Sequence, residues 1–174
     1  MTKETQMQDD IYRLSCEIIA ETNHNSILQS IRYLEENPKN SPYDAIVLAL
    51  QEGKKEEFFR LFTKLNPNIA WTDSYNNNFL GFAVTGENLT VIKFLIEMGC
   101  EINHPGRYNI TPLIGACMQI PNSKQKMRKI IEYILEAGAD VSLVDDMGHN
   151  ALYYAMQTYY DNELYIKLTP PITN

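Results

Sequence analysis

Histidine, cysteine and tryptophan are scarce: the 174-residue sequence has three histidines, three cysteines and one tryptophan. An odd number of cysteines at unrelated spacings is not the framework that disulfide-stabilised secreted domains use. We therefore expect a reducing, cytoplasmic location. Cys100, His104 and Cys117 could approach one zinc ion, but a fourth ligand at matching spacing is missing. We expect no metal and no cofactor, and we interpret these cysteines as small buried apolar side chains.

Long hydrophobic runs are also missing. The first ten residues, MTKETQMQDD, are polar and charged and contain no apolar segment of the kind found in secretory signals. The aliphatic run from Ile46 to Leu50 is too short to span a bilayer. We therefore expect neither a secretory signal nor a membrane segment.

Catalytic motifs are absent as well. The sequence has no glycine-rich phosphate loop, no His-Glu-x-x-His pattern and no nucleophile elbow, so we expect no enzymatic activity. Apolar residues make up 44% and charged residues 21%, which is typical of a globular protein. The net charge of −7 disfavours nucleic acid as a partner and suits a basic protein.

What the sequence does contain is an internal repeat. The segments that begin at Asp73 and at Gly106 start 33 residues apart. Leu80 and Leu113 each follow seven residues after these starts. A period of this length is typical of architectures built from stacked helical units.

The ends of the two segments also correspond. The first runs into Gly99-Cys-Glu-Ile-Asn and the second into Gly138-Ala-Asp-Val-Ser, and the second contains the triplet Thr111-Pro112-Leu113. Over about residues 40–168 the chain resembles the ankyrin repeat family, whose pattern reads D-x-x-G-x-T-P-L-H-x-A and ends in G-A-D-V-N. The resemblance implies an all-α solenoid of antiparallel helix pairs joined by short β-turn fingers, with about four repeats and a helical N-terminal cap.

This interpretation treats residues 1–174 as one domain. It divides the domain into a helical cap (1–40), a degenerate repeat (41–70), a repeat (71–104), a repeat with an inter-helix insertion (105–143) and a C-terminal capping repeat (144–174). In the cap we expect one helix over about residues 8–22 and a second one capped at Asn25-Ser26. The cap could instead be a separate functional element. The insertion at 121–126 is either a longer surface turn or a partner-specific loop.

Several positions predict local structure. Asn78, in the place of the family's Thr, is a good helix N-cap, and Asn66 can adopt the left-handed conformation that ends a helix. The family's His after Leu is absent, and Gly81, Ile114 and Tyr153 stand there. In the family this His helps to join neighbouring repeats through hydrogen bonds with Thr, so we expect those bonds to be missing here and the stability between repeats to rely more on apolar packing. Trp71 either packs beneath a finger or contacts a partner.

The resemblance also implies where a partner would bind: at the fingers and at the exposed ends of the first helices. Carried across, these positions are Ser74, Tyr75 and Asn77; Arg107, Tyr108 and Ile110; Asp146, Met147 and His149; and Thr85, Met118, Gln119, Gln157 and Thr158. Tyrosine, methionine and arginine are enriched in interface cores. The alternative is that these are single exposed apolar residues of the ordinary kind.

One basic cluster, Lys124, Lys126, Arg128 and Lys129, is either a solvated helix start or a site for phosphate or an acidic partner. Taken together, the sequence predicts a non-enzymatic module, monomeric when free, that binds another protein through its concave face. It could be a stoichiometric inhibitor, such as an immunity protein against a cognate toxin. The alternative is an adaptor or a secreted effector that engages a host protein.

Overall fold

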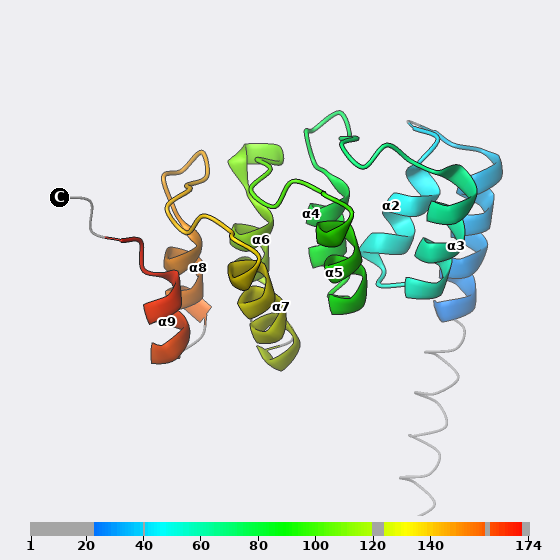
Figure 1. Ribbon diagram of the computed structural model, residues 1–174. Helices are drawn as coiled ribbons and strands as arrows, with labels where there is room; N and C mark the ends of the chain where they lie inside the picture. The colour runs from blue at the N-terminus through cyan, green and yellow to red at the C-terminus, as the bar shows by residue number, and fades with distance from the viewer. Residues whose placement is uncertain (1–22, 40, 120–123, 159–160, 172–174) are drawn as a thin grey trace, which may run out of the picture. The chain divides into compact units, whose positions relative to one another are not determined.

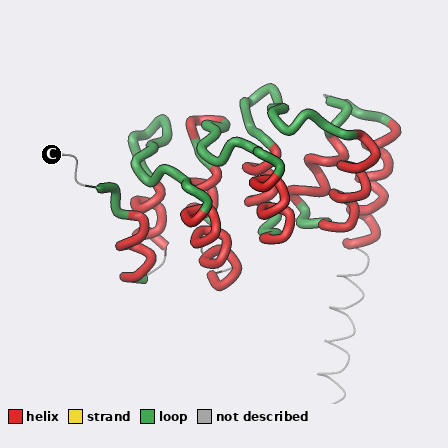
Figure 2. Tube along the Cα trace, in the orientation of Figure 1, coloured by secondary structure: helices red, strands yellow, loops and turns green. Residues whose placement is uncertain are grey.

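Helices joined by loops make up the part of the chain that the structure describes, which covers residues 23–39, 41–119, 124–158 and 161–171 (Figure 2). The structure is a computed structural model. Within the described ranges no strand forms, and the two isolated β-bridges lie in loops. The prediction of an all-α chain is confirmed for these residues. The chain divides into two compact units, Met1–Ala45 and Ile46–Asn174, which we describe separately. The predicted division into a cap and four repeats stays a prediction.

In the first unit, residues 23–36 are helical. The helix ends before Asn37-Pro38, as the proline predicts, and the Asn37 side chain donates a hydrogen bond of 3.1 Å to the Tyr33 carbonyl oxygen. Asn25 and Ser26 lie inside the helix, so the cap predicted there is wrong. A short polar residue can occupy an exposed helical position as well as a cap, and sequence alone does not separate the two. The helix predicted over residues 8–22 lies outside the described residues.

Helix pairs follow one another along the rest of the chain (Figure 1). In order, the helices are α2 (Asp44–Gln51), α3 (Lys55–Leu65), α4 (Phe79–Thr85), α5 (Leu89–Glu97), a 3₁₀ turn η1 (Arg107–Asn109), α6 (Pro112–Met118), α7 (Lys124–Glu136), α8 (Ala151–Thr158) and α9 (Asn162–Leu168). Within the second unit, α4 packs on α5, α6 on α7 and α8 on α9. Neighbouring pairs pack through α4 with α6, α6 with α8, and α5 with α7.

Leucine and alanine fill the space between the first helices of successive pairs. Leu80 and Leu113 are buried, and so are Ala83, Ala116 and Ala155 at the equivalent position of each helix. Alanine at this position lets neighbouring helices approach closely. Fully burying one leucine contributes roughly 1.5–3 kcal/mol, so this repeated pattern is a main source of stability.

Two first helices have side-chain N-caps, Asn78 as predicted for α4 and Thr111 for α6. Asn78 Oδ1 accepts a hydrogen bond of 2.9 Å from the Gly81 amide, and Thr111 Oγ1 accepts one of 3.3 Å from Ile114. Pro112 occupies the first helical position of α6, where its missing N–H had no partner. Asn66 ends α3 with φ of 42°, as predicted for a left-handed helix end.

An aromatic cluster fills the core around α3 and α5. The rings of Phe58, Phe62 and Phe94 lie 5.2–6.0 Å apart between centroids. Trp71 stacks on Phe79 at 4.9 Å with 29° between the ring planes. Of the two alternatives for Trp71, packing beneath its finger is the one that the structure supports.

The insertion predicted between the helices of the third pair is placed differently. Helix α7 begins at Lys124 and has 13 residues, whereas its counterpart α5 has nine. Residues 124–126 therefore lengthen the helix rather than the turn, and the predicted loop at 121–126 is wrong for that part. Met127, one turn into α7, is fully buried, which explains why the helix extends. Residues 120–123 lie outside the described residues.

Two interhelix turns meet through their glycines. A Cβ atom at Gly86 would lie 1.8 Å from the Leu50 carbonyl oxygen, and one at Gly53 would lie 2.6 Å from the Gly86 carbonyl oxygen. Backbone therefore packs directly on backbone where the turn after α2 meets the turn after α4. Only glycine allows this approach.

We predict that Gly86→Ala lowers the free energy of unfolding by about 2 kcal/mol or more, because backbone must move to admit the methyl group. Gly115→Ala is the matched control. Its Cβ would meet only the Ile110 side chain at 3.7 Å, so it should raise stability by up to about 1 kcal/mol through helix propensity. Urea unfolding measures both variants. A Gly86→Ala variant as stable as the wild type would disprove this close packing.

Candidate protein-interaction site

Three loops precede the first helices of the last three pairs, and we call them finger 1 (residues 72–78), finger 2 (106–110) and finger 3 (144–150). Fingers 1 and 3 are each closed by an antiparallel bridge, Thr72 with Asn78 and Val144 with Asn150. Finger 2 is closed by a hydrogen bond of 3.1 Å from the Gly106 amide to the Ile110 carbonyl. The three loops are therefore ordered turns of similar build.

An aspartate at the first turn position organises fingers 1 and 3. Asp73 Oδ1 accepts hydrogen bonds from the amides of Tyr75 and Asn77 at 2.9 and 2.8 Å. Asp145 Oδ1 accepts from the amides of Met147 and His149, both at 2.9 Å. The carboxylate thereby pairs donors that would otherwise lack a partner in a tight turn.

Finger 2 has Gly106 where the others have aspartate, and a neighbouring finger compensates. Asn77 Oδ1, from finger 1, accepts the Arg107 amide at 3.0 Å. A Cβ at Gly106 would lie 2.7 Å from that same oxygen, so glycine is needed for the contact. Finger 2 therefore depends on finger 1 for its shape.

Further polar bonds join the fingers in series. Asn76 Nδ2 donates to the Pro105 carbonyl at 2.6 Å, just before finger 2. The Asp146 amide of finger 3 donates to the Tyr108 carbonyl at 3.0 Å, and Asn109 Nδ2 donates to the Asp146 carboxylate at 2.6 Å. Asparagine side chains therefore supply polar bonds between neighbouring fingers that the sequence analysis did not predict, and the run Asn76 to Asn78 is the sequence signal for them.

Two tyrosines enclose the guanidinium of Arg107. Its Cζ atom lies 4.7 Å from the ring centroid of Tyr75 in finger 1 and 4.6 Å from that of Tyr108 in finger 2. Nη2 also donates a hydrogen bond of 2.7 Å to the Tyr108 hydroxyl. Both tyrosines are 57% exposed. We call these three side chains the tyrosine–arginine clamp.

The backbone at Tyr108 is strained. Tyr108 has φ of 59° and Asn109 has φ of 58°, so two consecutive non-glycine residues adopt the left-handed conformation. For a bulky residue this conformation is rare and costs roughly 1–2 kcal/mol. Such strain at an exposed tyrosine is typical of a residue retained for binding rather than for the fold.

A groove opens beside the clamp, between α4 and α6. Its volume is about 280 Å³. Its lining includes Gly81 and Gly115, which bring backbone to the surface, together with Phe82, Ile110, Thr85 and Gln119. Asn77, Arg107 and Tyr108 also line it. The groove therefore brings together residues from two fingers and two helices that the sequence predicted as partner-binding.

The other predicted site residues differ in how exposed they are and in what they contact. Met147 is 75% exposed at the tip of finger 3, and Met118 and Gln157 are exposed on α6 and α8. Asp146 is exposed but bonded to Asn109. His149 is half-buried and stacks on Tyr153 with 3.7 Å between centroids. Of the other predicted positions, Ser74 is exposed, whereas the side chain of Thr158 lies outside the described residues.

Sequence reasoning missed part of the groove, namely Gly81, Phe82 and Gly115. The two glycines lie in helices α4 and α6, where a side chain would normally cover the surface. Glycine in a helix costs up to about 1 kcal/mol relative to alanine. Two helical glycines at neighbouring positions of the repeat were the available signal.

A buried polar group supports finger 3. The Tyr154 hydroxyl donates to the second oxygen of the buried Asp145 carboxylate at 2.5 Å. Burial raises the pKa of Asp145. Hydrogen bonds from the Tyr154 hydroxyl and from the His149 and Met147 amides lower it by more, so the pKa falls below its ordinary value of 3.8. The bond to Asp145 raises the pKa of Tyr154 to about 12.

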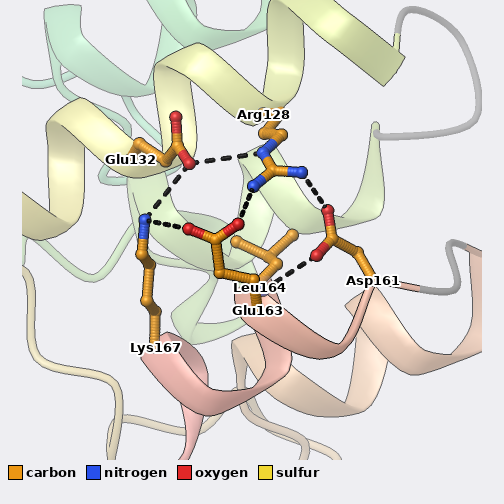
Figure 3. A network of polar contacts seen from close by, with 6 residues as sticks. All are labelled: Arg128, Glu132, Asp161, Glu163, Leu164 and Lys167. Atoms are coloured by element: carbon orange, nitrogen blue, oxygen red, sulfur yellow. Dashed lines mark hydrogen bonds and ion pairs between the residues drawn. The ribbon is translucent and has the colours of Figure 1, made fainter.

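The predicted basic cluster does not form a single positive surface. Arg128 on α7 contacts Glu132, Asp161 and Glu163 at 3.3, 2.5 and 2.7 Å, and Lys167 contacts Glu132 at 3.2 Å (Figure 3). Hydrogen bonds to Glu163 and Glu132 raise the pKa of Arg128. Burial raises the pKa of Glu132, but Lys167 and Arg128 lower it by more. This network ties α7 to α9, and it leaves Arg128 committed to carboxylates rather than to a phosphate.

The cysteines in the second unit are buried thiols. Burial raises the pKa of Cys117 to about 12 and also raises that of Cys100. His104 bonds the Asn76 carbonyl at 2.8 Å and Glu101 at 3.0 Å. Across the described residues, no three His, Cys, Asp or Glu side chains come together as a metal site. None of the helices in the described ranges combines the length and apolar character that a membrane crossing requires.

Comparison with known proteins gives one informative match. No protein-family model matches the chain. The chain is 29% identical over 96 residues to FPV034 of fowlpox virus (strain NVSL), a protein named as an ankyrin repeat protein. The match covers 55% of this chain and 21% of the fowlpox protein, so the chain spans only part of its relative's length.

Finger 3 yields a pH-dependent prediction. Tyr154→Phe should lower the free energy of unfolding by about 1–2 kcal/mol at neutral pH, because a bond to a charged, buried carboxylate is lost. The pKa of Asp145 is lower in the folded state than in the unfolded state. The stability that the ionised carboxylate contributes is therefore fully present above pH 3.8 and is lost as the pH falls through the folded-state pKa. The difference between variant and wild type should therefore shrink below about pH 4.

Urea unfolding at a series of pH values measures this difference. Tyr33→Phe is the control, because Tyr33 is 59% exposed, and it should show no pH-dependent change of this kind. A Tyr154→Phe penalty that stays constant down to about pH 2 would show that the Asp145 carboxylate does not depend on this bond.

Proposed function

We propose that this chain is a non-enzymatic module of the ankyrin repeat type that binds another protein through its fingers and the adjoining groove. The observation that carries the proposal is the tyrosine–arginine clamp at the edge of the groove. It presents Tyr75, Arg107 and Tyr108, from two fingers, as one exposed surface. Tyrosine and arginine are the residues most enriched in binding hot spots.

The proposed repeat architecture has three supports. The sequence has a 33-residue period, the first helices α4, α6 and α8 pack in series, and part of the chain is similar to a protein named as an ankyrin repeat protein. Each finger is joined to the next by side-chain hydrogen bonds. A surface that is already ordered loses less conformational entropy when it binds.

The exposed tyrosines and the helical glycines of this surface contribute little to folding stability. Tyr75 and Tyr108 are largely exposed, and Tyr108 holds a strained backbone conformation. Glycines at two helical positions open the groove at a cost in helix stability. These features are costly for folding and useful for contact, which favours a binding role.

Two more specific roles are proposed for the module. In one it is a stoichiometric inhibitor, such as an immunity protein that covers a cognate toxin, and the net charge of −7 fits a basic target. In the other it is an adaptor or a secreted effector that engages a host protein. We further propose a cytoplasmic protein that is monomeric when free, which sedimentation of the purified chain tests directly.

Affinity capture from the native host, with the full chain as bait, tests the proposed function. Replacing both Tyr75 and Tyr108 by alanine should weaken capture of a specific partner by about 30-fold or more, the loss expected for a hot spot of about 2 kcal/mol. The free energy of unfolding should change by less than about 1 kcal/mol, since both side chains are exposed.

Tyr33→Ala is the control, because Tyr33 is exposed to a similar extent, 59%, but lies in the first unit. Capture that is unchanged in the double variant would place the contact surface elsewhere on the chain. Reproducible catalytic turnover by the purified protein would contradict the non-enzymatic role.

A further inference from the structure

The charge of the groove differs from that of the whole protein. The chain carries a net charge of −7, yet no aspartate or glutamate is among the described residues that line the groove. Of these described lining residues, Arg107 alone is charged. A partner segment that enters the groove therefore meets a positive charge, although the protein as a whole is acidic.

Arg107 has no carboxylate partner among the described residues. Its side chain contacts the two tyrosine rings and the Tyr108 hydroxyl, and its backbone amide donates to Asn77. Two other arginines of the second unit behave differently: Arg60 pairs with Glu57 at 2.8 Å, and Arg128 pairs with three carboxylates. The acidic surface thus supplies a carboxylate to those two arginines and none to Arg107.

The clamp orients the Arg107 guanidinium for a carboxylate from a partner. A guanidinium has five N–H donors in one plane, and a single hydrogen bond to Tyr108 uses only one of them. Rings that lie 4.6–4.7 Å from Cζ restrict the side chain and leave the remaining donors at the edge of the plane. That edge matches the two oxygens of a carboxylate.

We propose that the partner presents an aspartate or glutamate side chain to Arg107, next to an apolar side chain that enters the groove. The apolar part of the proposal rests on Phe82 and Ile110 in the groove lining and on a volume of about 280 Å³, which suits a side chain rather than a larger ligand. A single guanidinium favours a carboxylate over a phosphate group, which proteins usually bind with several basic residues. This inference rests on the proposed function. It differs from the expectation of a basic partner, because the partner segment that binds at Arg107 is acidic.

The test uses a displayed library of random 12-residue peptides, selected on the full chain and on three variants. Arg107→Gln removes the charge, and Arg60→Gln is the matched control, since Arg60 lies outside the groove lining. Gly115→Leu fills the groove without altering the clamp. The wild type and Arg60→Gln should enrich the same peptides, with an aspartate or glutamate next to an apolar residue.

Peptides selected on the wild type should bind Arg107→Gln at least about 10-fold more weakly, and raising the salt concentration should weaken their binding to the wild type. Gly115→Leu should abolish their binding. Urea unfolding of each variant establishes that loss of binding is not loss of folding.

Three outcomes would overturn the inference. Groove-dependent peptides that lack any acidic residue would do so, as would acidic peptides that bind Arg107→Gln as tightly as the wild type. A library that enriches no peptide sensitive to Gly115→Leu would also count against it. In each case the proposed function survives if capture of a protein partner still depends on Tyr75 and Tyr108, so the two ideas fail separately.

Discussion

The fingers depend on hydrogen bonds that backbone amides donate to the oxygens of short polar side chains. Asp73 and Asp145 each hold two amides of their own turn, and Asn77 holds the amide of Arg107 in the next finger. Each bond is worth only about 1 kcal/mol net, but an unpaired amide in a tight turn would cost more. Because one of these bonds crosses between fingers, finger 2 takes its shape from finger 1, and the clamp exists only when both are in place.

The helices below supply a rigid base for this arrangement. Buried leucines and small alanines set the spacing of α4, α6 and α8, and that spacing brings one finger within hydrogen-bonding distance of the next. The same spacing leaves a groove where Gly81 and Gly115 carry no side chain. Packing and turn chemistry are therefore linked to the proposed binding surface. The features that are costly for folding, strained Tyr108 and two helical glycines, all line one groove.

Much of the local structure could be predicted from the sequence. The caps at Asn78 and Thr111 and the left-handed Asn66 rest on residues within one turn or one helix of each other, and the 33-residue period is a comparison of the sequence with itself. The bond from Asn77 to Arg107 and the groove join residues about 30 positions apart, and a single sequence does not reveal such contacts. The extension of α7 was missed because burial of Met127, a tertiary effect, decides where that helix begins. The predicted contact positions Tyr75, Arg107 and Tyr108 do lie together, whereas His149 is half-buried and stacks on Tyr153.

The central claim is that the fingers are ordered and joined to one another before any partner binds. Amide hydrogen exchange of the free chain tests this most directly. The amides of Arg107 and Asp146, which bond Asn77 and the Tyr108 carbonyl, should exchange at least about 100-fold more slowly than in an unstructured peptide. Asn77→Ala should remove the protection at Arg107 and leave that of the α4 amides intact. Exchange of both finger amides at the unprotected rate in the wild type would contradict the account.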